Sequence, residues 1–314
     1  MNEDLITIDQ INLIKDKALQ LGFSDIGFSS VQRLDDDALL FDQWIEEGKQ
    51  AEMDYMNHNR DKRLDPRLLV EGSICVISLL TLYKPAEEPI HRDAPKIARY
   101  AYGKDYHDVL KVKLHCLFNF IKEEIYPALE GRVFVDSAPV LERSWAKRGG
   151  LGWIGKNTHL IHPRLGSYTF ISELLVNFSV QPSIVNHLKN RCGSCTRCVD
   201  SCPTQALKPF SLDSRRCIAY LTIEHKGDIP NEFTGNFKDR VFGCDICQEV
   251  CPWNNKAPST EINEFKASSD ILNLSSADWS ALSHDQYLQL FKGSAVKRAK
   301  YHGLMRNIQF LRIQ

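Results

Sequence analysis

The sequence lacks the features that send a protein across or into a membrane. Its N-terminus has no apolar signal-peptide core and no twin-arginine pair, and no apolar run is long enough to cross a bilayer. Its formal net charge is only -1, so any contact with nucleic acid must come from a local basic patch. Internal repeats and low-complexity tracts are also missing. We therefore expect a cytoplasmic, monomeric protein that makes no membrane contact and whose thiols stay reduced.

A phosphate-binding P-loop is missing as well, although one stretch comes close to it. Residues 150–157 (GLGWIGKN) nearly match G-x4-G-K-[ST], but Asn157 replaces the hydroxyl residue that would hold Mg²⁺. The glycines also follow a predicted helix rather than a strand. We therefore exclude a nucleotide site here and expect the glycines to let the backbone approach a large, flat group.

What the chain does have is ten cysteines, eight of them in two sets that each end in Cys-Pro. The first set is C-x2-C-x2-C-x3-C-P, and the second is a distant cysteine followed by C-x2-C-x3-C-P. This is the spacing with which bacterial-type ferredoxins hold [4Fe–4S] clusters, and the fourth cysteine of each run binds the other cluster. The rule predicts one cluster on Cys192, Cys195, Cys198 and Cys251, and another on Cys202, Cys217, Cys244 and Cys247. Structural zinc is the alternative, although it needs no third cysteine between two pairs.

The two remaining cysteines and one long insert need separate interpretations. Cys75, in a buried strand, and Cys116, in a helix, are expected to be small core residues. The insert between Cys217 and Cys244, residues 218–243, is too long for a tight cluster loop. We expect it to line a substrate or cofactor cleft.

The rest of the chain reads as a mixed α and β protein of about two domains, at 314 residues and 43% hydrophobic composition. A capping box at Thr7 predicts a helix that ends at Gly22. Strands are predicted over 25–31, 73–82, 132–136 and 168–178, and helices over 39–47, 108–124, about 139–148 and much of 282–310.

Asp136 is the main catalytic candidate outside the cysteines. An aspartate at the end of a buried strand faces a site in many α/β proteins, but it could equally cap the following helix. The basic residues near the C-terminus likewise allow two interpretations, a solvated helix face or a phosphate contact.

Several longer segments together resemble one family. They are ARYAYGKDYH (98–107), VDSAPVLERSWAKRGGLGWIGKN (135–157), GSYTFISELL (166–175), CGSCTRCVDSCPTQAL (192–207), RCIAYLTIEHKG (216–227) and GCDICQEVCPWN (243–254). Over nearly the whole chain the sequence resembles the epoxyqueuosine reductases (QueG family). The resemblance implies an α+β fold: a nitroreductase-like α/β cobalamin-binding domain (1–185), a two-[4Fe–4S] ferredoxin-like domain (186–256, with insert 218–243) and a C-terminal helical segment (257–314).

The resemblance also implies a reaction, a cofactor and site residues. The reaction removes the epoxide oxygen of epoxyqueuosine at the wobble position of tRNAs with GUN anticodons. Cobalamin would carry the redox step. It would bind base-off, because no D-x-H-x-x-G motif supplies a histidine ligand. Asp136 would be the proton donor, with a pKa raised by burial. Cobalamin contacts would fall at Asp136 itself and at Ala98, Asn157, Leu160, Ile171, Ala219, Asp245 and Ile246.

The partners implied are the tRNA and an external electron donor of the flavodoxin or ferredoxin type. Lys226 and Arg240 are the candidates for tRNA phosphate contacts. Many family members continue into a C-terminal HEAT-like domain, of which this chain would lack most. Two rival functions remain, a cobalamin and iron–sulfur reductive dehalogenase and an iron–sulfur electron-transfer subunit.

Overall fold

A four-stranded antiparallel sheet forms the centre of the molecule. The computed structural model describes residues 4–181 and 188–312. The strands are β1 (Asp25–Ser30), β2 (Cys75–Leu82), β4 (Gly131–Phe134) and β7 (Thr169–Val176), in the order β1-β2-β7-β4. The central pair, β2 and β7, is in register from Cys75 opposite Val176 to Leu82 opposite Thr169. All four strands were predicted, but β4 ends two residues before Asp136.

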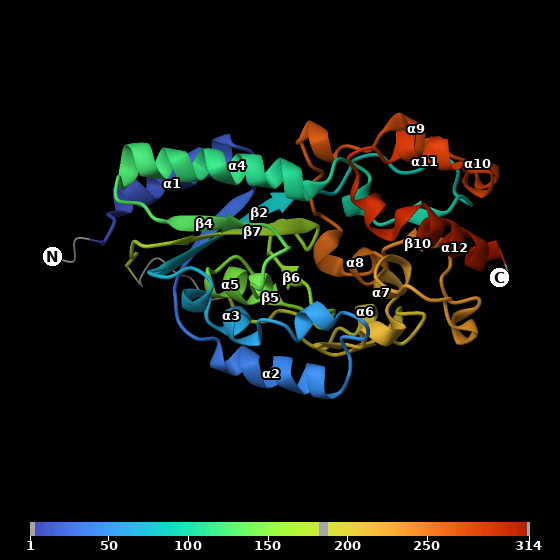
Figure 1. Cartoon of the computed structure of the whole chain (residues 1–314), viewed down its shortest axis with the longest axis horizontal. Coiled ribbons are helices and arrows are strands. Elements are labelled where there is room, and N and C mark those ends of the chain that lie inside the picture. Colours follow the sequence, from blue (N-terminus) through green and yellow to red (C-terminus); the bar gives the residue numbers. More distant parts are fainter. Residues whose placement is uncertain (1–3, 182–187, 313–314) are drawn as a thin grey trace.

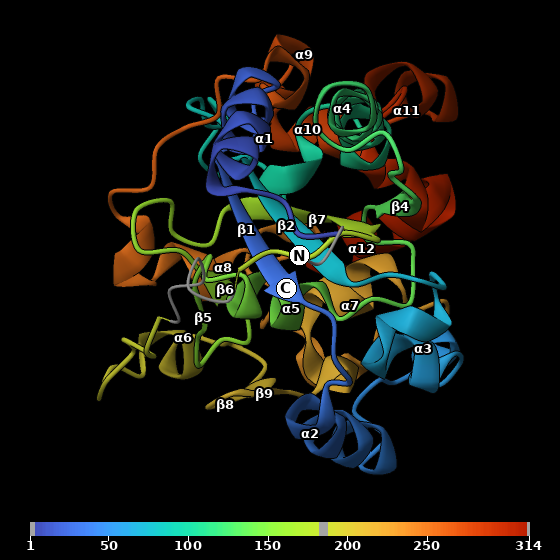
Figure 2. The same cartoon turned by 90° about the vertical axis from the view of Figure 1, so that its left-hand side faces the viewer.

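Helices cover both faces of this sheet (Figures 1 and 2). α1 (Ile8–Gln20) and α4 (Tyr106–Phe120) lie on one face, and α5 (Glu142–Arg148), α3 (Arg60–Leu64) and α2 (Asp35–Glu46) lie on the other. The alternation along β2 explains the two layers. Ile77 and Leu79 belong to the core under α1 and α4, whereas Val76 and Leu80 belong to the clusters under α5.

The sequence pattern accounts for α1 and α4. The predicted capping box of Thr7 with Gln10 is present, and Ile11, Ile14 and Ala18 are buried. α4 buries Leu110, Leu114 and Leu117, and a π-helical turn (Ile121–Ile125) continues it. The prediction that Cys116 is a core residue was wrong. Cys116 is exposed, because it lies off the stripe of leucines spaced four and three residues apart.

The cysteine-rich segment is built from short elements beside the sheet domain. α6 (Arg197–Asp200) and α8 (Ile246–Glu249) carry cluster cysteines and contact each other. Two small hairpins flank them, β5 (Trp153–Ile154) with β6 (Leu160–Ile161), and β8 (Leu207–Lys208) with β9 (Ser211–Leu212). The insert folds as α7 (Ile218–Ile223) and β10 (Arg240–Phe242).

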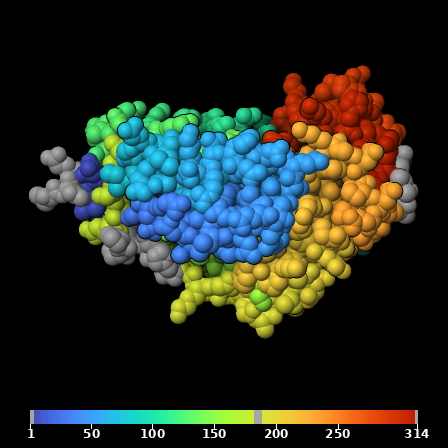
Figure 3. All heavy atoms as spheres, turned by 60° about the horizontal axis from the view of Figure 1, so that its bottom comes forward, coloured from blue at the N-terminus to red at the C-terminus, as the bar shows by residue number. Residues whose placement is uncertain are grey.

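The C-terminal segment packs onto the rest of the chain through its own hydrophobic core. α9 (Ser269–Leu272), α10 (Ser276–Ser280), α11 (His284–Leu290) and α12 (Lys300–Arg312) surround a parallel pair formed by β3 (Lys96–Ile97) and β10. In the space-filling view of Figure 3 this red segment and the yellow and orange cysteine-rich segment share one end of the molecule. The helices of the described residues include none that is long and apolar enough to span a bilayer.

Candidate active site and cluster sites

A cleft of about 1170 Å³ lies where the sheet domain, the insert and the C-terminal segment meet. Four stretches of chain line it: the loop before α3, the start of α4, the loop from β4 into α5, and α7 with residues 293–298. Pockets for drug-sized ligands usually have volumes of about 300–1,000 Å³, so this cleft is large enough for a sizeable cofactor or a nucleoside. Asp136 and Ala219, both candidates from the sequence, line it together with Cys217.

Asp136 is held in the cleft by a fixed set of hydrogen bonds. The Tyr106 hydroxyl donates to its Oδ2 at 3.0 Å, and His107 Nε2 lies 3.2 Å from the same oxygen. The Asp136 backbone has a positive φ of 55°, and its N–H donates to Glu142 Oε1 at 2.6 Å. A non-glycine residue in this conformation is uncommon and needs support from its surroundings. The structure therefore fixes both the backbone and the carboxylate of Asp136.

The expectation that burial would leave Asp136 with a raised pKa was wrong. Burial does act in that direction, but the hydrogen bonds from His107 and Tyr106 outweigh it and lower the pKa. The effect on His107 is the reverse. Hydrogen bonds to Asp105 and Asp136 raise the pKa of His107 to about 9. At neutral pH the proton of this pair therefore resides on His107, next to an ionised Asp136.

Two further carboxyl groups lie behind Asp136. Burial and the nearby Asp136 raise the pKa of Glu142 to about 8. Glu173, in the middle of β7, is fully buried, and burial together with the Glu142 carboxyl raises its pKa well above the ordinary value. Both groups are therefore largely neutral at pH 7. The charged groups in direct contact here are therefore Asp136, His107 and the second partner of His107, Asp105, whose pKa is lowered by its hydrogen bond to His107.

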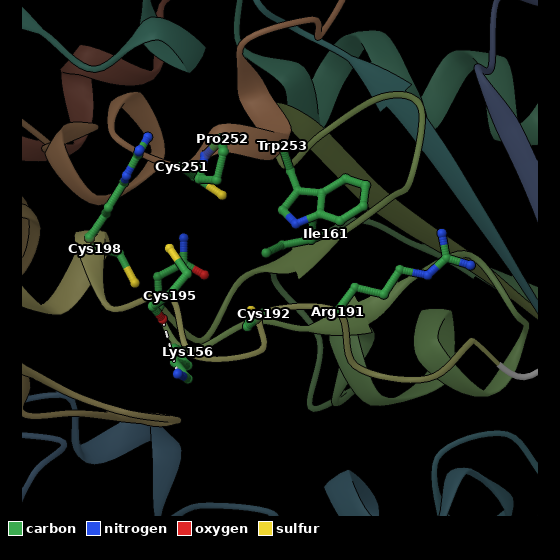
Figure 4. Close-up of a pocket in the computed structure, with 11 residues that line it drawn as sticks. Lys156, Ile161, Arg191, Cys192, Cys195, Cys198, Cys251, Pro252 and Trp253 are labelled. Carbon is green, nitrogen blue, oxygen red and sulfur yellow. Dashed lines mark hydrogen bonds between the residues drawn. The ribbon is translucent and has the colours of Figure 1, made fainter.

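The four cysteines predicted for the first cluster line one small cavity of about 80 Å³ (Figure 4). Cys192 and Cys195 come from the loop before α6, Cys198 from α6, and Cys251 from the end of α8. Trp253 and Ile161 form an apolar wall beside them. The structure thus brings Cys251 to the first run of cysteines, as the ligand swap requires.

In the second predicted set, Cys217 and Cys244 pack against the same hydrophobic cluster. Burial raises the pKa of Cys217, with a further contribution from Cys202. Burial raises the pKa of Cys244 to about 12, and the neighbouring Cys217 adds to it. Cys247, with its pKa raised mainly by burial, is close to both Cys244 and Cys217. Crowded, buried thiols cannot ionise together unless cationic metal compensates them, which is what an iron–sulfur cluster provides.

The described residues contain no group of three His, Cys, Asp or Glu side chains arranged around a single metal ion.

Two residues of the stretch that almost matches a P-loop, residues 150–157, make hydrogen bonds to the cysteine-rich segment. Lys156 Nζ donates to the carbonyl oxygens of Gly193 and Cys195, at 2.8 and 3.0 Å. Asn157 is buried and lines the same cavity, and its amide donates to the Cys247 carbonyl at 3.4 Å. This lysine therefore fixes the loop that carries Cys192 and Cys195.

The other candidate cobalamin contacts do not line the cleft and are mostly buried among protein atoms. Leu160 and Ile171 pack together in one apolar cluster below α5. Ala98 donates its backbone N–H to the Phe242 carbonyl, and the Asp245 carboxylate accepts the N–H of Arg99 at 2.7 Å. Ile246 packs against α7. Of the eight candidates, only Asp136 and Ala219 line the cleft itself.

The two candidate tRNA contacts differ. Lys226 is exposed. Arg240 is 7% exposed, and its guanidinium pairs with Glu249 at 2.7 Å and with Asp239 at 3.5 Å. The assignment of Arg240 as a phosphate contact was therefore wrong, because two carboxylates already neutralise its buried charge.

Several residues of the site were not singled out from the sequence. Tyr106 and His107 lie in segment 98–107, which was one of the segments that carry the family resemblance but gave neither residue a role. Glu142 and Glu173 gave no signal, because each lies in an ordinary helix or strand pattern. Arg298 lines the cleft and pairs with Glu224 at 3.0 Å, and its sequence context showed only a basic helix.

Fold and site together define an iron–sulfur oxidoreductase with two cluster sites beside a nitroreductase-like domain. The family described as 4Fe-4S double cluster binding domain matches residues 191–254, and the family described as Epoxyqueuosine reductase QueG, DUF1730, matches residues 63–137. The epoxyqueuosine reductase of Leadbetterella byssophila is 46% identical over 95% of this chain and 97% of its own length. The chain belongs to the epoxyqueuosine reductase family and is an enzyme of the oxidoreductase class, which sets aside the dehalogenase and electron-carrier alternatives.

Solved structures agree with this assignment. An epoxyqueuosine reductase in complex with an epoxyqueuosine-modified tRNA-Tyr stem loop has a TM-score of 0.85 and 28% identity, covering 96% of this chain and 80% of that one. The Bacillus subtilis enzyme, solved with its catalytic aspartate loop swung out of the active site, has a TM-score of 0.83 and 27% identity, covering 96% of this chain and 81% of that one.

Proposed function

We propose that this epoxyqueuosine reductase acts on tRNA with a GUN anticodon and uses cobalamin, two [4Fe–4S] clusters and Asp136. One observation carries the proposal: a single large cleft contains Asp136, with its histidine partner, and Cys217, a ligand of the second cluster site. An acid and an electron source thus reach the same cavity. The reaction balances as epoxide plus two electrons and two protons, giving an alkene and water.

The cleft and its walls fit cobalamin in size and chemistry. The cleft volume suits a corrin together with part of a nucleotide, and Ala219 presents a small side chain from α7. The other six candidate residues do not line the cleft and would support the corrin only from behind the residues that do. They are Ala98, Asn157, Leu160, Ile171, Asp245 and Ile246. When bound, cobalamin would supply a low-potential metal centre for opening the epoxide. No histidine is assigned to its cobalt.

His107 and Asp136 would act together as the proton source. His107 Nε2 holds the proton at neutral pH and lies 3.2 Å from Asp136 Oδ2. Asp136 would receive the proton from His107 and pass it to the leaving oxygen, and Tyr106 would keep the carboxylate oriented. Because His107 loses this proton as pH rises through its pKa of about 9, activity should fall over the same range of pH.

Electrons would enter from an external flavodoxin- or ferredoxin-type donor and pass through the two clusters. We assign Cys192, Cys195, Cys198 and Cys251 to one cluster and Cys202, Cys217, Cys244 and Cys247 to the other. Cys217, one of the proposed ligands of the second cluster, lines the cleft, so this cluster would deliver the electrons to the reaction. Lys226 and the cleft residue Arg298 would meet tRNA phosphates, whose charge a local basic patch must balance.

The test is an anaerobic assay with cobalamin, a strong reductant and an anticodon stem loop that carries epoxyqueuosine. Mass spectrometry of the digested nucleosides should show the loss of one oxygen with the wild type. Asp136→Asn should reduce the rate by about 10²- to 10⁴-fold, the usual contribution of a general acid, while the cobalamin and iron content stay at wild-type levels. His107→Gln should reduce the rate less and should remove its dependence on pH near 9.

Three results would contradict parts of the proposal. One is full activity of Asp136→Asn, which would exclude the carboxylate as the acid. The other is oxygen loss in protein that is free of cobalamin, which would exclude that cofactor. A protein that holds iron and cobalamin but leaves the nucleoside unchanged would rule out this substrate.

A further inference from the structure

The first cluster site lies away from the cleft and is open to solvent. Its cavity and the cleft share no lining residue. Cys192, Cys195 and Cys198 are only half-buried, and Gly193, Ser194 and Thr196 of the same loop are exposed. In Figure 3 the yellow part of the chain, which includes this loop, projects from the lower edge of the molecule. Electrons from outside would therefore reach this site first.

The rim of this opening is basic. Arg191 and Arg197 are exposed and line the cavity, and Lys156 lies below the loop (Figure 4). The nearby Asp200 is engaged by the Thr196 hydroxyl at 2.7 Å. The rim thus carries three cations beside the one carboxylate of Asp200, a local excess of positive charge in a chain whose net charge is only -1. We call Lys156, Arg191, Arg197 and the exposed loop residues 193–196 the cluster rim.

Aromatic packing keeps part of the rim in place. The Arg191 guanidinium lies 5.9 Å from the centre of the Trp153 ring, and Trp153 meets Trp253 edge to face at 4.8 Å. Lys156 is fixed by the two carbonyls of the cysteine loop. Two of the three cations are therefore pre-positioned, which reduces the entropy lost when a partner binds.

We propose that the cluster rim is the docking surface for a small, acidic, one-electron carrier protein. This inference rests on the proposed function of the two clusters as an electron relay. A cluster accepts single electrons, and a carrier must bring its own redox centre near the exposed cysteine loop. A carrier with carboxylates around its redox centre would match the rim in charge, and this complementarity would speed its encounter with the enzyme.

The experiment compares two double variants that change the net charge equally. The double variant Arg191→Glu with Arg197→Glu reverses the charge at two of the three cations of the cluster rim. Lys15→Glu with Lys122→Glu is the control, with both changes near α1 and α4 on the other side of the sheet domain. The probe is a reduced bacterial flavodoxin, an acidic carrier, mixed anaerobically with each oxidised protein in a stopped-flow instrument. The bimolecular rate of cluster bleaching is measured at low and at physiological salt.

The wild type and the control should be reduced rapidly at low salt and more slowly as salt screens the attraction. Reversing the rim should slow reduction by flavodoxin at low salt by about tenfold or more and should remove most of the salt dependence. Dithionite, which needs no protein docking, serves as the reference reductant for each variant. Equal flavodoxin rates in all three proteins, each reduced normally by dithionite, would overturn the docking surface.

Two other outcomes would also overturn it and would identify the reason. If the rim variant binds the tRNA stem loop less tightly while flavodoxin reduces it at the wild-type rate, the rim is an RNA contact and not the docking surface. If dithionite reduces no cluster in the wild type while its iron content is full, the relay itself is wrong, and the proposed function fails with the docking surface.

Discussion

Glu173 is the most unusual single residue of the sheet domain. It is fully buried on β7, opposite Ser78 on β2 and Phe134 on β4. Among the described residues, no cation or backbone N–H pairs with its carboxylate oxygens, its one close polar neighbour is the Glu142 carboxyl, and the Ser78 hydroxyl is also unpaired. A buried carboxylate without a counter-charge would cost several kcal/mol, so the folded protein holds the group protonated.

This protonation gives a pH dependence with a definite sign. The pKa of Glu173 is raised on folding, so above its ordinary value of 4.5 the folded state holds a proton that the unfolded state releases. Stability should therefore fall as pH rises from about 4.5 toward the folded pKa. Glu173→Gln removes this loss, so it should stabilise the protein increasingly as pH rises above about 4.5, with little effect near pH 4.5.

Urea unfolding over this pH range measures the effect, and the exposed Glu123→Gln is the matched control. That change should shift the unfolding free energy by less than about 0.5 kcal/mol at every pH. A Glu173→Gln protein less stable than the wild type at pH 8 would show that the carboxylate has a partner or a needed charge.

Residues of the site differ in how far the sequence could predict them. The cluster cysteines could be assigned because their ligand chemistry requires fixed spacings along the chain. Asp136 could be selected as a candidate, but its pKa could not be predicted. That value depends on Tyr106 and His107, which approach it from α4 about thirty residues away in sequence. The prediction that Arg240 contacts phosphate was wrong for the same reason, because its sequence context does not show that Glu249 neutralises its charge.

At the scale of elements, α5 and β1 meet at an unusually close contact. A Cβ atom added to Gly27 would lie 2.3 Å from the Gly149 carbonyl oxygen at the end of α5. Because this oxygen belongs to the backbone at the end of α5, it cannot move aside alone, and the helix would have to move away from the strand. α5 begins at Glu142, which holds the Asp136 backbone, so the contact connects the sheet with the catalytic loop.

Gly27→Ala should therefore destabilise the protein by about 1–3 kcal/mol, the usual cost of overpacking. Gly303→Ala on α12 is the matched control, because its Cβ would lie 3.5 Å from the nearest side-chain atom, an ordinary contact. An alanine at that helical position should instead stabilise by about 1 kcal/mol. Thermal midpoints of the two variants should move in opposite directions. An unchanged midpoint for Gly27→Ala would mean that the helix has room to shift.

The elements themselves were largely predictable, and their contacts were not. Apolar periodicity indicated α1, α4 and the four strands, because each buries one face or a continuous run. The split of the C-terminal helical pattern at residues 295–299 was not predicted. There Ser294 caps a 3-10 turn and donates to the Ala101 carbonyl, a contact that only the folded chain creates.

At the scale of the whole molecule, the C-terminal helix secures the insert between two cluster ligands. The fully buried Asn307 of α12 donates to the Thr222 carbonyl at 2.8 Å and to the Val241 carbonyl at 2.7 Å. Arg306 donates to the carbonyls of Leu221 and His225. The contacts to Thr222 and Val241 fall on α7 and β10, which follow Cys217 and precede Cys244. The C-terminal segment therefore supports the second cluster site from a distance.

Asn307→Ala tests this connection. It leaves two buried backbone carbonyls without their donor, so it should destabilise the protein by about 2–3 kcal/mol. Because the insert links Cys217 to Cys244, the loss should be accompanied by a lower iron content, with the second cluster lost before the first. Gln309→Ala, at an exposed position of the same helix, should change neither quantity. Thermal unfolding and iron analysis of anaerobically purified protein measure both. Destabilisation with full iron content would show that the second cluster holds the insert without help from α12.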